Sequence, residues 1–94
     1  MVLTLGAKGA QWLDRDRRIV AVPPPVDVVD TTGAGDAFVG ALAASLHKQM
    51  PPRESLACAV AAGTLACRGA GAQGMMPDAG EIEELCASVR VDAT

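Results

Sequence analysis

Aromatic residues are nearly absent from this sequence of 94 residues, which has one tryptophan, one phenylalanine and no tyrosine. The apolar half of the chain therefore consists mostly of alanine, valine and leucine, whose small side chains each bury little area. Basic residues are also few and form no cluster, and the net charge of -3 argues against a nucleic-acid partner. A chain this short forms one small domain, whose core is marginal unless something completes it.

Paired cysteines and long apolar runs are missing too. Cys58, Cys67 and Cys86 form no CxxC motif. We interpret them as small core residues in a reducing compartment rather than as metal or redox groups. The N-terminus lacks the basic and long apolar regions of a signal peptide, and the uncharged stretch of residues 56–67 is too short to span a bilayer. We therefore expect a cytoplasmic protein with no membrane partner.

Short strands are expected in the first quarter of the chain, where apolar runs are separated by turn residues. The three candidates are Val2–Leu5, Ala10–Leu13 and Arg18–Val22. The polar residues 14–17 mark an exposed turn between the last two. Three prolines at positions 23–25 then enforce an extended connection, because proline fixes φ and cannot donate a hydrogen bond. Residues 26–29 are a further strand candidate.

Helices are expected after these strands, which makes the fold class α/β. Residues 37–46 are apolar nearly all round, as in a buried helix, and Phe38, Leu42 and Leu46 share one face. Pro52 opens a second helix that runs to about Arg68, with Glu54 in its first turn. A third helix is predicted over Ala79–Val89, with Asp78 and Glu81 as a capping box.

The segment VVDTTGAGDAF, residues 28–38, has the composition of an anion site. Glycine and alanine leave the backbone N–H groups uncovered, and the following helix adds unpaired N–H groups and a partial positive charge. Such a site suits a phosphate. A carboxylate at its mouth, Asp36, is then a candidate general base that takes a proton from an attacking hydroxyl. The same residues also fit a plain N-cap and a glycine turn, and the residue chemistry leaves both interpretations open.

Two other phosphate-binding motifs are excluded. A P-loop requires GxxxxGK[ST], and the sequence contains no such string. A dinucleotide fingerprint requires GxGxxG between a strand and a helix. Residues 69–74 match the letters but follow a predicted helix, so the context is wrong.

The segment DTTGAGDAF closely resembles the C-terminal signature of the ribokinase-like (PfkB) sugar kinases. TLGAKG, residues 4–9, resembles the nucleotide-binding strand and turn of that family, and AVAAGTLACRGAGAQ, residues 59–73, resembles its helix and loop beside the adenine. Within the family the sequence is most similar to ribokinases. The resemblance implies a three-layer α/β/α fold, of which residues 1–94 are the C-terminal ATP-binding and catalytic portion. The N-terminal sugar-binding part is then absent, and we expect the isolated fragment to be inactive.

The resemblance also implies a role for each motif residue. Asp36 is the catalytic base, and Gly33, Ala34 and Gly35 form the anion hole. The residues expected to contact ATP with its Mg²⁺ are Thr4, Leu5, Gly6, Ala7, Lys8 and Gly9, together with Gly35 and Asp36. A monovalent cation, K⁺, would be bound by Asp30, the carbonyl of Thr32 and the carbonyls of Ala66, Gly69 and Gly71.

The expected function is therefore transfer of the ATP γ-phosphoryl group to a sugar hydroxyl. Among substrates, the alternatives to ribose are fructose and a keto-sugar acid, because the residues that read the sugar lie elsewhere. The resemblance implies a homodimer for the full-length enzyme. The alternative of another class is a non-catalytic fragment that binds a nucleotide or a partner chain, which the short length and small core favour.

Overall fold

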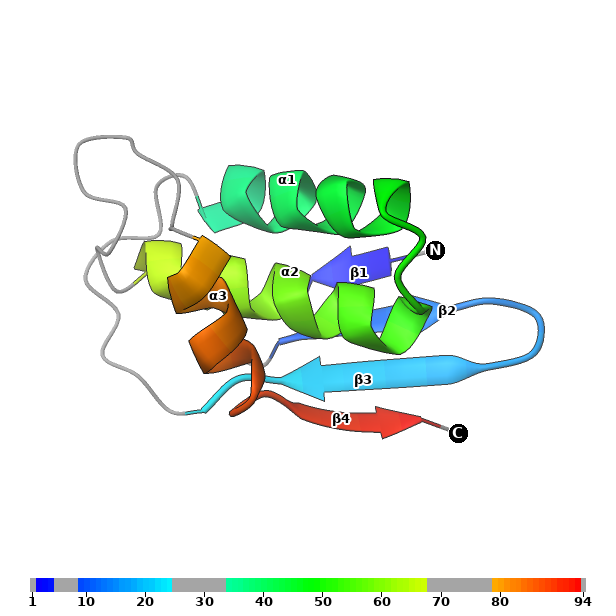
Figure 1. The fold of residues 1–94 in the computed structure, drawn as a ribbon. Coiled ribbons are helices and arrows are strands. Elements are labelled where there is room, and N and C mark those ends of the chain that lie inside the picture. The colour runs from blue at the N-terminus through cyan, green and yellow to red at the C-terminus, as the bar shows by residue number, and fades with distance from the viewer. Residues whose placement is uncertain (1, 5–8, 25–33, 68–78, 94) are drawn as a thin grey trace.

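The computed structural model describes residues 2–4, 9–24, 34–67 and 79–93. A four-stranded sheet lies against a layer of helices (Figure 1). The strands are antiparallel and follow the chain order β1-β2-β3-β4. The elements are β1 (Val2–Thr4), β2 (Ala10–Leu13), β3 (Arg18–Val22), α1 (Ala34–His47), α2 (Pro52–Cys67), α3 (Ala79–Cys86) and β4 (Arg90–Ala93). The predicted α/β class, three of the strands and all three helices are thus confirmed.

One face of the sheet forms the core because side chains alternate along each strand. Ala10 and Trp12 on β2 pair with Ala21 and Ile19 on β3, so these four side chains share a face. Ala10, Ile19 and Ala21 are almost completely buried, and Trp12 packs against them. Burying a side chain such as Ile19 contributes about 1.5–3 kcal/mol.

Helix α2 crosses this face and contacts β2, β3 and β4, with α1 on one side and α3 on the other (Figure 1). More than half of its buried apolar residues are alanines, whose small side chains allow close packing against neighbouring elements. The buried members are Leu56, Ala57, Ala59, Val60, Ala61, Ala62 and Leu65. Ser55 is also buried, and its hydroxyl donates a hydrogen bond to the Met50 carbonyl at 3.2 Å. Arg53 ties the helix to β4, since its guanidinium donates to the Val91 carbonyl at 3.4 Å.

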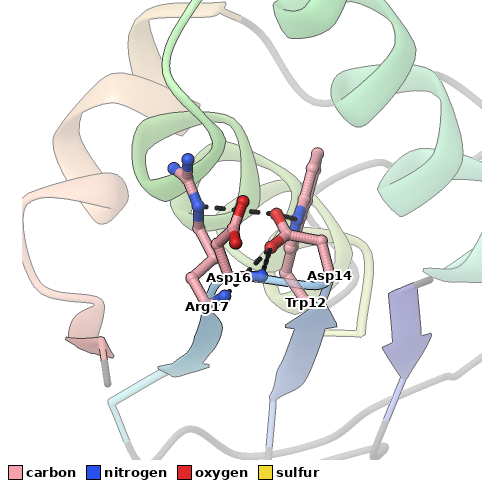
Figure 2. A network of polar contacts seen from close by, with 4 residues as sticks. All are labelled: Trp12, Asp14, Asp16 and Arg17. Carbon is pink, nitrogen blue, oxygen red and sulfur yellow. Dashed lines mark hydrogen bonds and ion pairs between the residues drawn. The ribbon is translucent and has the colours of Figure 1, made fainter.

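The turn between β2 and β3 is organised by one carboxylate (Figure 2). Oδ1 of Asp14 accepts hydrogen bonds from the backbone N–H groups of Asp16 at 2.8 Å and Arg17 at 3.0 Å. Oδ2 accepts from the indole N–H of Trp12 at 3.2 Å and lies 3.4 Å from Nε of Arg17. These bonds, led by that from Asp16, lower the pKa of Asp14 below its ordinary value of 3.8. The predicted exposed turn is confirmed, and its surface ion pair is of the weak kind.

Helix α1 ends in a Schellman motif without a glycine. The N–H of Gln49 donates to the Leu46 carbonyl at 2.9 Å, and the N–H of Met50 donates to the Ser45 carbonyl at 3.1 Å. Gln49 has a φ of 61°, a left-handed conformation that glycine normally occupies at this position. The last carbonyls of α1 are satisfied in this way, and the chain turns directly into α2.

The expectation that α1 is buried all round is wrong. Phe38 is buried, but Val39 on the outer side is 63% exposed and Leu46 is 43% exposed. The reason is that α1 packs along α2 on one side and has no described element against the other. α1 therefore has more apolar surface than its packing against α2 buries.

The predicted end of α3 is also wrong, and the strand β4 was missed. The helix stops at Cys86, and a turn follows in which the N–H of Val89 donates to the Cys86 carbonyl at 3.1 Å. Val89 is buried, and Val91 two residues later faces the same core. Pairing with the edge of β3 provides hydrogen bonds and burial that extra helix would not, so tertiary contacts override the helical pattern.

The opposite face of the sheet has no helix among the described residues. Leu3 is 43% exposed there, and the side chains of Leu13, Val20 and Val22 are only half-buried. A three-layer arrangement needs helices on this face as well, and the described residues provide two layers. None of their helices has the length and apolarity needed to cross a membrane.

Candidate active site

The first turn of α1 carries the residues predicted to handle phosphate. The helix begins at Ala34, and Gly35 and Asp36 are exposed in its first turn. A methyl group placed on Gly35 would meet no other part of the described structure within 4 Å, so the described residues do not cover this side of the turn. The N–H groups at the start of a helix lack partners within the helix and carry partial positive charge. Gly33, the remaining predicted anion-hole residue, lies outside the described residues.

Asp36 is the third residue of α1, which argues against the simple N-cap interpretation. A capping carboxylate lies before the helix and accepts from its first N–H groups. Asp36 lies inside the helix, is exposed, and has no hydrogen bond or ion pair from its carboxylate to another described residue. Its oxygens are thus free to accept a proton from an incoming hydroxyl group.

Only the two ends of the predicted ATP-contacting segment are described. Thr4 is the exposed last residue of β1, and Gly9 is buried just before β2. Gly9 has a φ of +100°, and a Cβ atom there would lie 1.9 Å from the Ala21 carbonyl oxygen. Glycine is therefore required for the chain to pass β3 this closely. Residues 5–8, which include the predicted contacts Leu5, Gly6, Ala7 and Lys8, lie outside the described residues.

Of the predicted monovalent-cation site, the structure describes one residue. Ala66 is half-buried in the last turn of α2, where helix carbonyls lack partners and the helix dipole is negative. This environment suits a cation. Asp30, Thr32, Gly69 and Gly71 lie outside the described residues. Among the residues that are described, no cluster of three or more His, Cys, Asp or Glu side chains could hold a metal ion.

The described parts of the three predicted sites meet at one end of the molecule. Helix α1 begins there, α2 ends there, and β1 runs toward it (Figure 1). Gly9 belongs to the same end, because Thr4 pairs with Ala10. The positive end of α1 thus lies near the negative end of α2. An anion at the first and a cation at the second would be stabilised by the two helices together.

The interpretation of the cysteines as core residues agrees with the structure for Cys86, which packs against the core cluster. Cys58 on α2 and Cys86 on α3 are half-buried, and their sulfur atoms are 3.7 Å apart. Cys67 is the last residue of α2, and its side chain lies outside the described residues. No motif in the sequence predicts this pair, because its members lie 28 positions apart.

Comparisons with known proteins agree with this architecture. Residues 1–79 match the family model of pfkB family carbohydrate kinases. The chain is 42% identical to 1-phosphofructokinase of Escherichia coli (strain K12) over 66 residues, covering 70% of this chain and 21% of that protein. It is 39% identical to ribokinase of Lactococcus lactis over 85 residues, covering 88% of this chain and 28% of that protein.

Among solved structures, phosphofructokinase-2 of E. coli in complex with potassium superposes with a TM-score of 0.80 at 34% identity. The match covers 92% of this chain and 27% of that one. The chain therefore belongs to the pfkB family of carbohydrate kinases, and its fold is that of the matched part of the E. coli structure. It spans between a fifth and a third of the length of the relatives that it matches.

Proposed function

We propose that this chain forms the phosphate-handling portion of an ATP-dependent sugar kinase. The observation that carries the proposal is the first turn of α1, where the exposed Asp36 carboxylate has no partner among the described residues and follows Gly35 directly. A carboxylate beside a phosphate-binding turn repels the phosphate unless it has a chemical task of its own. Proton abstraction from a sugar hydroxyl is a task that suits the Asp36 carboxylate, while the backbone at Gly35 binds the phosphate.

In the proposed reaction, Asp36 takes the proton of the sugar hydroxyl as that oxygen forms a bond to the γ-phosphorus of ATP. The bond from this phosphorus to the bridging oxygen breaks, and ADP leaves. The backbone N–H groups of Gly33, Ala34 and Gly35 stabilise the negative charge on the phosphoryl oxygens. Stabilisation by preorganised N–H groups is usually a large part of such catalysis.

Nucleotide binding is assigned to the segment from Thr4 to Gly9. Thr4 is exposed at the end of β1, on the side of the molecule where α1 begins. The close approach of Gly9 to the Ala21 carbonyl fixes how the chain enters β2. Mg²⁺ bound to the nucleotide would neutralise phosphate charge that the protein does not itself balance.

We also propose a K⁺ site formed by Asp30, Thr32, Ala66, Gly69 and Gly71. Support comes from Ala66, which lies at the negative end of the α2 dipole, close to where α1 begins. E. coli phosphofructokinase-2, which is similar to this chain, has a structure in complex with potassium. The cation would orient the turn before α1 without taking part in proton transfer.

The substrate is proposed as a sugar, with ribose first, and fructose or a keto-sugar acid as alternatives. The related proteins include a ribokinase, a 1-phosphofructokinase and a probable fructokinase-4 of Arabidopsis thaliana, so a phosphorylated ketose joins these alternatives. A cytoplasmic location, a homodimer in the complete enzyme and inactivity of the isolated chain remain predictions. The second candidate function is a non-catalytic fragment that binds a nucleotide or a partner chain. It is favoured by the exposed apolar side chains of Val39 and Leu46 on α1.

A chimera tests the catalytic proposal. This chain would replace the matching segment of E. coli phosphofructokinase-2, which supplies the rest of the kinase. We expect phosphoryl transfer by the chimera, and a fall in kcat of roughly 10²–10⁴ on Asp36→Asn, as for the loss of a general base. Asp16→Asn, an exposed carboxylate on the β2–β3 turn, is the matched control and should leave kcat unchanged. An active chimera whose Asp36→Asn variant stays within a few-fold of it would refute the role of Asp36.

A further inference from the structure

The two half-buried cysteines form a contact between helices. Cys58 lies on α2 and Cys86 is the last residue of α3, and their sulfur atoms are 3.7 Å apart. The contact lies at the edge of the core, against which Cys86 packs. Both thiols are only half-buried, so a small molecule can reach them.

The geometry is close to that of a bond. The sulfur atoms of a disulfide are about 2.05 Å apart, so these two need to approach by less than 2 Å. Rotation of the two side chains and a small shift of α3 can supply this approach. α3 is only eight residues long and packs mainly on α2, so the required shift concerns a single short element.

We propose that Cys58 and Cys86 are a redox-active dithiol that closes to a disulfide between α2 and α3. The co-reactant is a low-molecular-weight disulfide of the glutathione type. One cysteine attacks a sulfur of this disulfide and forms a mixed disulfide, expelling one small thiol. The second cysteine then attacks the protein sulfur and expels the other small thiol. The protein loses two S–H bonds and gains one S–S bond, while the reagent takes up two electrons and two protons.

The surroundings of Cys86 slow its attack on a disulfide. Burial, the neighbouring Cys58 and the carboxylates of Glu54 and Glu83 raise the pKa of Cys86 to about 11. The thiolate is the attacking species, so few Cys86 side chains are reactive at neutral pH. A thiol of high pKa is also a poor leaving group, so the finished disulfide resists attack by external thiols on Cys58. The site therefore responds to sustained rather than brief oxidation.

A disulfide between Cys58 and Cys86 would restrain α3 and the strand that follows it. α3 leads through a short turn into β4, the edge strand that completes the sheet. A link from Cys86 to α2 would fix this C-terminal unit to the central helix. The inference concerns the thiols alone and does not depend on the proposed kinase activity.

Tryptic digestion tests the proposal, because cleavage after arginine residues separates the two cysteines into different peptides. In a Cys67→Ser chain, trypsin cleavage after Arg53, Arg68 and Arg90 puts Cys58 in peptide 54–68 and Cys86 in peptide 69–90. The folded chain is equilibrated with oxidised and reduced glutathione, quenched with acid, digested and analysed by mass spectrometry. We expect the two peptides joined by a disulfide. The equilibrium constant for closure should be on the order of 10²-fold higher than for the same chain in concentrated guanidinium chloride.

Two results would overturn the proposal: separate glutathione adducts on the two peptides, or an equilibrium constant no higher in the folded than in the denatured chain. If the Cys67→Ser variant does not fold, the unmodified chain gives the same answer. Its peptide 69–90 contains Cys86 alone, and fragmentation of the joined product distinguishes Cys58 from Cys67 as its partner. Joining to Cys67, or no joining, counts against the proposal.

Discussion

Gly9→Ala should strongly destabilise the fold, because both the backbone conformation and the available space at this position require glycine. The φ of +100° is unfavourable for any residue with a Cβ atom, at a cost of about 1–3 kcal/mol. The added Cβ would also lie 1.9 Å from the Ala21 carbonyl oxygen and 2.9 Å from its carbon. These are backbone atoms of β3, so relief requires separating two paired strands, with a further cost of about 1–3 kcal/mol.

The total, about 2–6 kcal/mol, is a large share of the stability of a domain this size, which is about 5–15 kcal/mol. Thermal unfolding followed by Trp12 fluorescence and circular dichroism measures it, since Trp12 lies on β2 itself. We expect the melting temperature to fall by about 8 °C or more. A variant that melts within about 2 °C of the original chain would show that the passage beside β3 is not constrained as described.

Gly35→Ala is the matched control for this substitution. A Cβ atom at Gly35 meets none of the other described residues within 4 Å, and the residue is already helical. Alanine there should leave the stability unchanged or raise it by up to about 1 kcal/mol. In the chimeric kinase the same methyl group would stand where the phosphate approaches the backbone, so activity should fall while stability does not. Equal destabilisation by the two substitutions would contradict the account.

Three further predictions concern stability. Gln49→Gly should raise the free energy of unfolding by about 0.5–1 kcal/mol, measured by urea denaturation, because glycine removes the strain of the left-handed φ. Folding lowers the pKa of Asp14, so the stabilising contribution of this carboxylate is present above about pH 3.8 and is lost as the pH falls through the lower folded value. In a profile of melting temperature against pH, Asp14→Asn should therefore reduce the fall in melting temperature on the acid side. Folding raises the pKa of Cys86 from 9.0 to about 11, so its contribution is complete below pH 9 and is lost as the pH rises toward 11; a Cys86→Ser chain should lack that loss.

Much of the fold could be predicted because its local signals agree with its tertiary structure. The apolar runs of β2 and β3 are bounded by turn residues, and Pro52 marks the start of α2. The end of α3 could not be predicted in this way. The helix was expected to continue to Val89, and the strand that follows pairs with an edge of β3 that the local sequence does not reveal. That edge is created by distant parts of the chain.

The candidate functional residues show the same contrast between local signals, which were predicted, and tertiary contacts, which were not. The GAGD motif predicted a helix that begins with an exposed glycine and carboxylate, and α1 begins in this way. The cysteine pair was missed because it depends on how α3 lies against α2, and no spacing along the sequence encodes that packing. The outer side of α1 was misjudged for a related reason, since composition indicates how much apolar surface exists and not which part of it is covered.

The most direct test of the central claim is a thermal melt of the chain with Mg·ATP, with Mg·AMP as the control that lacks the terminal phosphates. If the first turn of α1 binds phosphate, Mg·ATP at about 100 times its dissociation constant stabilises the fold by about 2.7 kcal/mol. The account predicts a clear rise in melting temperature with Mg·ATP, a smaller rise with Mg·AMP, and loss of the difference in a Gly35→Ala chain. A cooperative melt that Mg·ATP does not shift would contradict the claim that these residues form the phosphate site.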